Sequence, residues 1–79
     1  MEIVHPTGVS SAALGKFLRH KESGCWMGIE GSLVRDFREA RPIKSILEAM
    51  DLCRHLHLSG MELVLKFDQS SFDVVLPMD

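Results

Sequence analysis

The stretch that decides the fold is residues 61–78, MELVLKFDQSSFDVVLPM. Apolar and polar side chains alternate on both sides of a short polar segment, and this period of two is typical of β-strands with one buried face. A hairpin with Gln69-Ser70 as its loop brings apolar residues together on one face, in the pairs Phe67 with Phe72, Leu65 with Val74, Leu63 with Leu76 and Met61 with Met78. A slip of one residue would break every pair, so the pattern predicts the register as well as the hairpin.

The opposite face of this hairpin and its end carry two further expectations. Lys66 lies opposite Asp73 in the same register, and Val64 lies opposite Val75. Pro77 has no N–H to donate to a neighbouring strand. The last strand is therefore expected at an edge of the sheet.

A helix is predicted immediately before the hairpin. Pro42 suits a first turn, Ser45 and Glu48 have the spacing of a capping box, and Gly60 is expected at a left-handed position where the helix stops. The apolar residues that follow a period of 3.6 are Ile43, Ile46, Leu47, Met50, Cys53 and His57. We expect this helix to lie across the apolar face of the hairpin.

The N-terminal part of the chain predicts a short strand and a second helix. Residues 2–5 are expected to be extended, and the helix is expected from Ser10 or Ser11 to a stop at Ser23-Gly24. Its apolar stripe is formed by Ala13, Leu14, Phe17 and Leu18. Gly15 would cost this helix about 1 kcal/mol relative to alanine, so the helix would depend on its packing.

Residues 25–41 are compatible with two structures. A hairpin with Gly31-Ser32 as its loop pairs Trp26 with Phe37, which is a favourable aromatic pair. A helix capped by Ser32 places Leu33, Phe37 and Ala40 on one face instead. The hairpin is favoured, and the choice stays open.

These elements predict an α+β fold in a single domain, residues 1–79. It consists of an antiparallel sheet of four to five strands with two helices packed on one face. At 79 residues the core is small. The sequence contains neither a run of 18 apolar residues nor a basic, apolar N-terminal leader, so we expect a soluble cytoplasmic protein without a membrane partner.

The residues that carry catalysis or bind metals are present without the required spacing. Cys53 and His57 share a helix face, but a structural zinc site needs four ligands, usually in close pairs. The serines and glycines form neither a nucleophile elbow nor a phosphate-binding loop. We therefore expect no enzymatic activity, no metal and no cofactor.

Charge and side-chain type point to surfaces for a macromolecular partner. The net charge is −2, and residues 59–79 hold one lysine against four acids. This balance is unfavourable for binding nucleic acid directly and suits a partner with a basic surface. The candidate partner-binding residues are the acids Glu62, Asp68, Asp73 and Asp79, together with Trp26, Arg35 and Arg38. For Trp26, burial in the core is the alternative that its residue type favours.

The arrangement of helix, hairpin, helix and closing hairpin (Met61 to Met78) in a small acidic chain resembles phage-encoded inhibitor proteins of the anti-CRISPR kind. The resemblance covers layout and size only. It implies an inhibitor in the host bacterial cytoplasm that binds a bacterial CRISPR surveillance complex and blocks DNA binding, through a surface that mimics phosphate charge.

Two alternative functions come from the residues themselves. One is a small self-associating domain that pairs its last strand with a copy. The other is a weak nucleic-acid binder using Trp26 and the row Arg35, Arg38 and Arg41. Whether the chain is a monomer or a dimer stays open.

Overall fold

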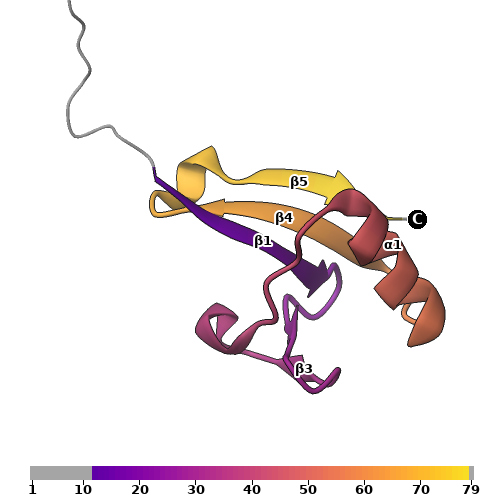
Figure 1. Ribbon diagram of the computed structural model, residues 1–79. Helices are drawn as coiled ribbons and strands as arrows, with labels where there is room; N and C mark the ends of the chain where they lie inside the picture. The colour runs from indigo at the N-terminus through magenta and orange to yellow at the C-terminus, as the bar shows by residue number, and fades with distance from the viewer. Residues whose placement is uncertain (1–11, 79) are drawn as a thin grey trace, which may run out of the picture.

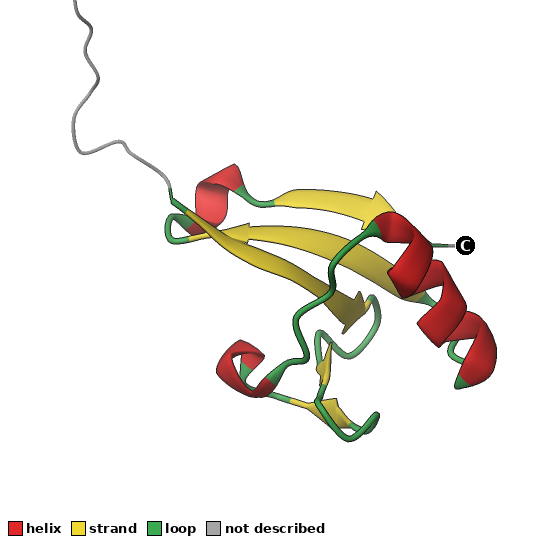
Figure 2. Cartoon of the chain, in the orientation of Figure 1, coloured by secondary structure: helices red, strands yellow, loops and turns green. Residues whose placement is uncertain are grey.

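The computed structural model describes residues 12–78. These residues form one five-stranded antiparallel sheet in the order β3-β2-β1-β4-β5, with one α-helix against it (Figures 1 and 2). In chain order the elements are β1 (Ala13–His20), β2 (Trp26–Met27), β3 (Leu33–Val34), the 3-10 helix η1 (Phe37–Glu39), α1 (Ile46–His55), β4 (Met61–Phe67), the 3-10 helix η2 (Ser70–Phe72) and β5 (Val74–Pro77). The α+β class is confirmed, but only one α-helix is present in the described part of the chain where two were expected. The strand expected at residues 2–5 lies outside the described residues.

The closing hairpin has the predicted register. Leu65 pairs with Val74, and Leu63 pairs with Leu76. Its loop is longer than expected, because η2 fills the turn and removes Phe72 from the ladder. The predicted pair of Phe67 with Phe72 is therefore wrong. The prediction that the last strand is an edge is confirmed, since β5 lies at one end of the sheet.

The segment expected to be the first helix is strand β1, at the centre of the sheet. Phe17 and Leu18 point to opposite faces because they are neighbours in a strand, and both are buried because β1 is covered on both faces. Adjacent buried residues hide the period of two and imitate a helical stripe. Gly15 lies at a bulge with φ of 134°, a conformation that other residues rarely adopt.

Residues 25–41 contain the hairpin that the sequence favoured, in a different register. Trp26 pairs with Val34, and Met27 pairs with Leu33. Phe37 belongs to η1 instead of the ladder, although its ring still lies 5.9 Å from that of Trp26. The expected cross-strand pair is therefore wrong, while the aromatic contact exists.

The Ser45 cap of helix α1 is confirmed, but the predicted first turn at Pro42 is wrong, since Ile43 pairs with Lys16 of β1, and the helix ends at His55, before Gly60. The Ser45 side chain accepts a hydrogen bond from the Glu48 N–H, and Gly60 has φ of 68°. The residues that pack against the sheet are Ala49, Leu52 and Cys53. In contrast, Ile46, Leu47 and Met50 of the predicted stripe are 47, 73 and 44% exposed.

Two small apolar clusters lie on the two faces of the sheet. The face under α1 is formed by Leu18, Met27, Ile43, Ala49, Met61 and Leu63, which confirms that the helix lies across the hairpin face. The other face is formed by Phe17, Trp26, Ala40 and Val64, with Val34 and Phe37 at its margin. The two faces thus have separate cores, and the extended segment before α1 joins β1 through a bond from the Ile43 N–H to the Lys16 carbonyl.

Candidate interaction surface

Glu62, the first of the predicted acidic residues, is neutralised within the fold. Its carboxylate lies 2.7 Å from Nη2 of Arg19 and also accepts from Nε of the same residue. The Glu62 side chain is only 13% exposed. Two N–H groups of one guanidinium bind the same carboxylate oxygen, and the two charges largely neutralise each other. Glu62 therefore adds little negative potential to the surface.

Asp73, the second predicted acid, is the structural centre of the β4–β5 turn. Its carboxylate accepts from Lys66 Nζ at 3.0 Å and from the Phe67 N–H at 2.9 Å, which confirms the predicted pairing with Lys66. Burial alone would raise the pKa of Asp73, but the Phe67 N–H, the Lys66 ammonium and the charge of Arg19 outweigh it and hold that pKa below its ordinary value. Asp73 therefore closes the turn.

We expect replacement of Asp73 by asparagine to remove a stabilising contribution that depends on pH. Because the folded-state pKa is lowered, the carboxylate stabilises the fold above the ordinary value of about 4, and this stability is lost as the pH falls through the folded-state pKa. Asp73→Asn should lower the free energy of unfolding by about 1–3 kcal/mol at pH 7. Urea unfolding between pH 2 and pH 7 measures both effects. An Asp73→Asn protein with the same acid sensitivity as the native chain would contradict this role.

The remaining predicted acids do not complete a patch. Asp68 is exposed at the start of the turn, and Asp79 lies outside the described residues. Among the acids proposed for partner binding that lie within residues 12–78, Asp68 is the one whose carboxylate is exposed. Of the expected acidic patch of Glu62, Asp68, Asp73 and Asp79, the Glu62 and Asp73 carboxylates bind cations of the same chain, so the described members do not form a patch of free acids.

Trp26 is a core residue and does not form an exposed anchor. It is 7% exposed, and its ring packs edge-on against Phe17 with centroids 6.2 Å apart. The Arg19 guanidinium lies 5.3 Å above the ring. A partner or a nucleic-acid base would have to displace these contacts, so the expected role of Trp26 in binding is corrected to a structural one.

The arginine row extends from the segment after β3 through the 3-10 helix η1 to the segment after it, and two of its three members are paired. Arg38 is bound by Asp36 at 2.8 Å, and its hydrogen bonds are the main cause of a lowered Asp36 pKa. Arg41 lies 3.4 Å from Glu48. Arg35 is exposed and lines a hollow with Ser23, Gly24 and Cys25. The row therefore provides one exposed cation without a charge partner among the ion pairs of residues 12–78.

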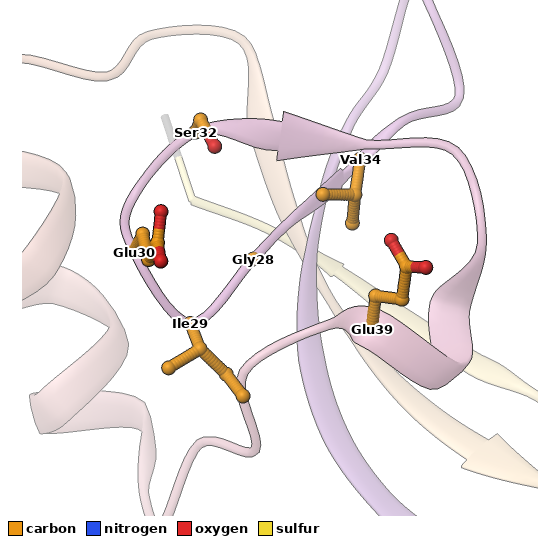
Figure 3. A pocket seen from close by; sticks show the side chains of 6 residues that line it. All are labelled: Gly28, Ile29, Glu30, Ser32, Val34 and Glu39. Atoms are coloured by element: carbon orange, nitrogen blue, oxygen red, sulfur yellow. The ribbon is translucent and has the colours of Figure 1, made fainter.

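A hollow of about 230 Å³ lies between the β2–β3 loop and η1 (Figure 3). Its lining residues are Gly28, Ile29, Glu30, Ser32, Val34 and Glu39. Glu39 rises from η1 toward Val34, whereas Ile29 points away from the loop and is 70% exposed. The Glu30 and Glu39 side chains are both exposed to solvent, so their charges stay hydrated. The hollow therefore offers few buried polar groups that could bind a small ligand.

A serine–histidine pair is present in the turn after β1. His20 Nδ1 lies 2.9 Å from Ser23 Oγ, and the same oxygen accepts from the Cys25 N–H. The Nε2 side of His20 faces the backbone at Gly60. These bonds close the turn locally. Within residues 12–78 no group of three metal-ligating side chains comes together.

The most exposed apolar element of the sheet is β5, which sequence reasoning had considered only as an alternative. Val74, Val75 and Leu76 are 45, 41 and 41% exposed, and Phe72 before them is 43% exposed. The strand Val74–Pro77 carries no charge. Pro77 was the signal in the sequence that indicated an edge strand. The alternating pattern predicted that one face of this strand is buried, and it therefore did not indicate that side chains on both faces are exposed.

The backbone of β5 has one side free of the sheet. The Met78 N–H binds the Met61 carbonyl, so by the alternation of an antiparallel ladder Leu76 and Val74 also point their backbone groups to β4. The N–H and C=O of Val75 then point outward, away from β4. Pro77 also faces outward, but it offers only its carbonyl because proline has no N–H. An edge of this kind presents hydrogen-bonding groups to another strand.

Among residues 12–78, none of the helices has the length and apolar character needed to cross a bilayer. No known protein-family model matches the chain, and neither curated proteins nor solved structures show a significant similarity to it.

Proposed function

We propose that this chain is a non-enzymatic protein-binding module whose docking element is the edge strand β5. The observation that carries the proposal is the combination of exposed apolar side chains with outward backbone groups at one uncharged strand. A partner strand gains main-chain hydrogen bonds from such an edge and covers its side chains on both faces. The cytoplasm is the proposed location.

The balance of exposed and buried apolar residues supports this proposal. In residues 12–78, large apolar side chains more than 40% exposed outnumber the apolar residues of the buried core. A contiguous group of such side chains is typical of an interaction site, whereas single ones are ordinary. On β5 the exposed side chains flank one strand edge, with Val74 and Leu76 on the helix face and Val75 on the other face.

A bacterial nucleic-acid-targeting complex remains a partner class within this proposal. An inhibitor of such a complex would dock through β5 rather than by mimicking phosphate charge, since Glu62 and Asp73 are paired within the fold. The nucleic-acid-binding alternative is less supported, because Trp26 is buried and Arg38 and Arg41 are bound to acids.

Three charge substitutions separate these functions. Val75→Lys places an ammonium on β5, and Leu33→Lys is the matched control, since Leu33 is 44% exposed on the opposite edge strand β3. Asp68→Lys tests the acidic surface. We expect Val75→Lys to weaken partner retention at least tenfold, while Leu33→Lys and Asp68→Lys retain the partner as the native chain does.

The measurement compares proteins retained from a bacterial lysate by the four immobilised chains, quantified by mass spectrometry. Circular dichroism confirms that each variant is folded. A partner lost with Asp68→Lys and kept with Val75→Lys would contradict docking at β5 and favour the acidic surface.

A further inference from the structure

The shape of β5 is suited to a second copy of itself. We propose that two copies of this chain pair their β5 strands antiparallel about a twofold axis at Val75, an inference that rests on the proposed function and names the partner. In this register Val75 lies opposite Val75 of the second copy, and Val74 lies opposite Leu76. The sheet then continues from one copy into the other.

Hydrogen bonding selects this register. Val75 has both an N–H and a C=O on the outward side of β5, whereas Pro77 has only a carbonyl, and the Asp73 N–H is already bound to the Ser70 carbonyl. Only the arrangement with Val75 opposite Val75 uses both outward groups of this residue, in two reciprocal bonds. A shift of the register in either direction leaves its carbonyl without a donor.

The side chains fit the same arrangement. Leu63 and Leu76 are paired on the helix face, and Leu65 and Val74 form the next pair along it. The second copy adds Val74 beside Leu76, so the apolar row runs across the junction. On the other face Val64 and Val75 are paired, and Val75 of the copy extends that row. Cross-strand apolar pairs of this kind stabilise a sheet.

Charge does not oppose the pairing. The strand has no charged residue, and the nearest carboxylate, Asp73, is held by Lys66. Asp73 would lie opposite Pro77 of the copy, so no like charges meet across the junction. The twofold arrangement consumes the β5 edge in both copies and therefore stops at two chains.

Disulfide formation between two cysteine variants tests the register. In the proposed pair, Val74→Cys of one copy faces Leu76→Cys of the other in a non-hydrogen-bonded position, with Cα atoms about 4.5 Å apart, within the range of a disulfide. Two Val74→Cys chains would be offset by two residues, about 8 Å, as would two Leu76→Cys chains, and neither pair can bridge. Each variant alone is therefore the matched control for the mixture.

The product is identified by mass after trypsin digestion. Lys66 is the last basic residue of the sequence, so residues 67–79 are released as one peptide that contains neither Cys25 nor Cys53. We expect a mixed disulfide between the two variant peptides, in at least tenfold excess over either symmetric product. A dominant symmetric product would overturn the register, and a mixed product only twice as abundant as each symmetric product, the ratio expected from random collision of equal amounts, would show collision without pairing.

Sedimentation of the native chain gives the second readout. We expect the mass to rise with concentration from that of one 8.9 kDa chain to twice that value, and Val75→Lys to abolish the rise. A single-chain mass at all concentrations would overturn self-pairing. In that case loss of a different partner with Val75→Lys would still support docking at β5, so the two proposals fail separately.

Discussion

Leu63→Ala is expected to unfold most of the protein or to lower its melting temperature by about 15 °C or more. Leu63 is 1% exposed, lies in the central part of β4, and contacts the cluster under α1. Truncating a buried leucine costs about 2–5 kcal/mol through lost burial and the cavity left behind. That is a large share of the stability of a small domain, which is at the lower end of about 5–15 kcal/mol.

Leu47→Ala is the matched control for this prediction. It removes the same atoms from a side chain that is 73% exposed on the outer face of α1. Its melting temperature in dilute solution should stay within about 3 °C of the native value, because little burial is lost. Thermal unfolding followed by circular dichroism compares the two. Equal losses at both positions would contradict the assignment of the core to the face under Ala49 and Leu52.

The part of the fold that the sequence predicts well is formed by local pairing. The β4–β5 register follows from alternation on two strands joined by a short turn, and one buried face makes a slip costly. The Ser45 cap depends only on residues three positions away. Both features are determined by residues that are close together in the sequence.

The part that could not be predicted depends on which elements cover which faces. Strand β1 resembles a helix because Phe17 and Leu18 serve different cores, and only the tertiary structure reveals that both faces are covered. Helix α1 has more apolar positions than one face can bury. The spacing of apolar residues along the helix does not show that Ala49, rather than Met50, packs against the sheet.

The sequence favoured an acidic surface over the edge strand for a related reason. Glu62 has the appearance of a free acid in the sequence, and its partner Arg19 is 43 positions away. Such a distant pair follows from the β1–β4 ladder, where Arg19 and Glu62 are direct partners. Pro77 marked the edge correctly, but the exposure of Val74 and Leu76 depends on where α1 lies.

The amide of Val75 is expected to show the largest dependence on protein concentration in hydrogen exchange. Its N–H points away from β4, so it should exchange at least a hundredfold faster than the Leu76 N–H in dilute solution, where Leu76 is protected by the ladder. Pairing of two β5 strands buries the Val75 N–H in a hydrogen bond. Its exchange should then slow by about tenfold or more as the concentration rises into the millimolar range.

Amide exchange of Val75, measured by NMR against Val74 and Leu76 in the same spectra, therefore tests the docking edge most directly. The structure predicts fast exchange of Val75 at low concentration and progressive protection at high concentration, while Val74 and Leu76 change little. Protection of Val75 equal to that of Leu76 in the most dilute sample would contradict a free edge. Fast exchange of Val75 at every concentration would contradict its pairing with a second copy.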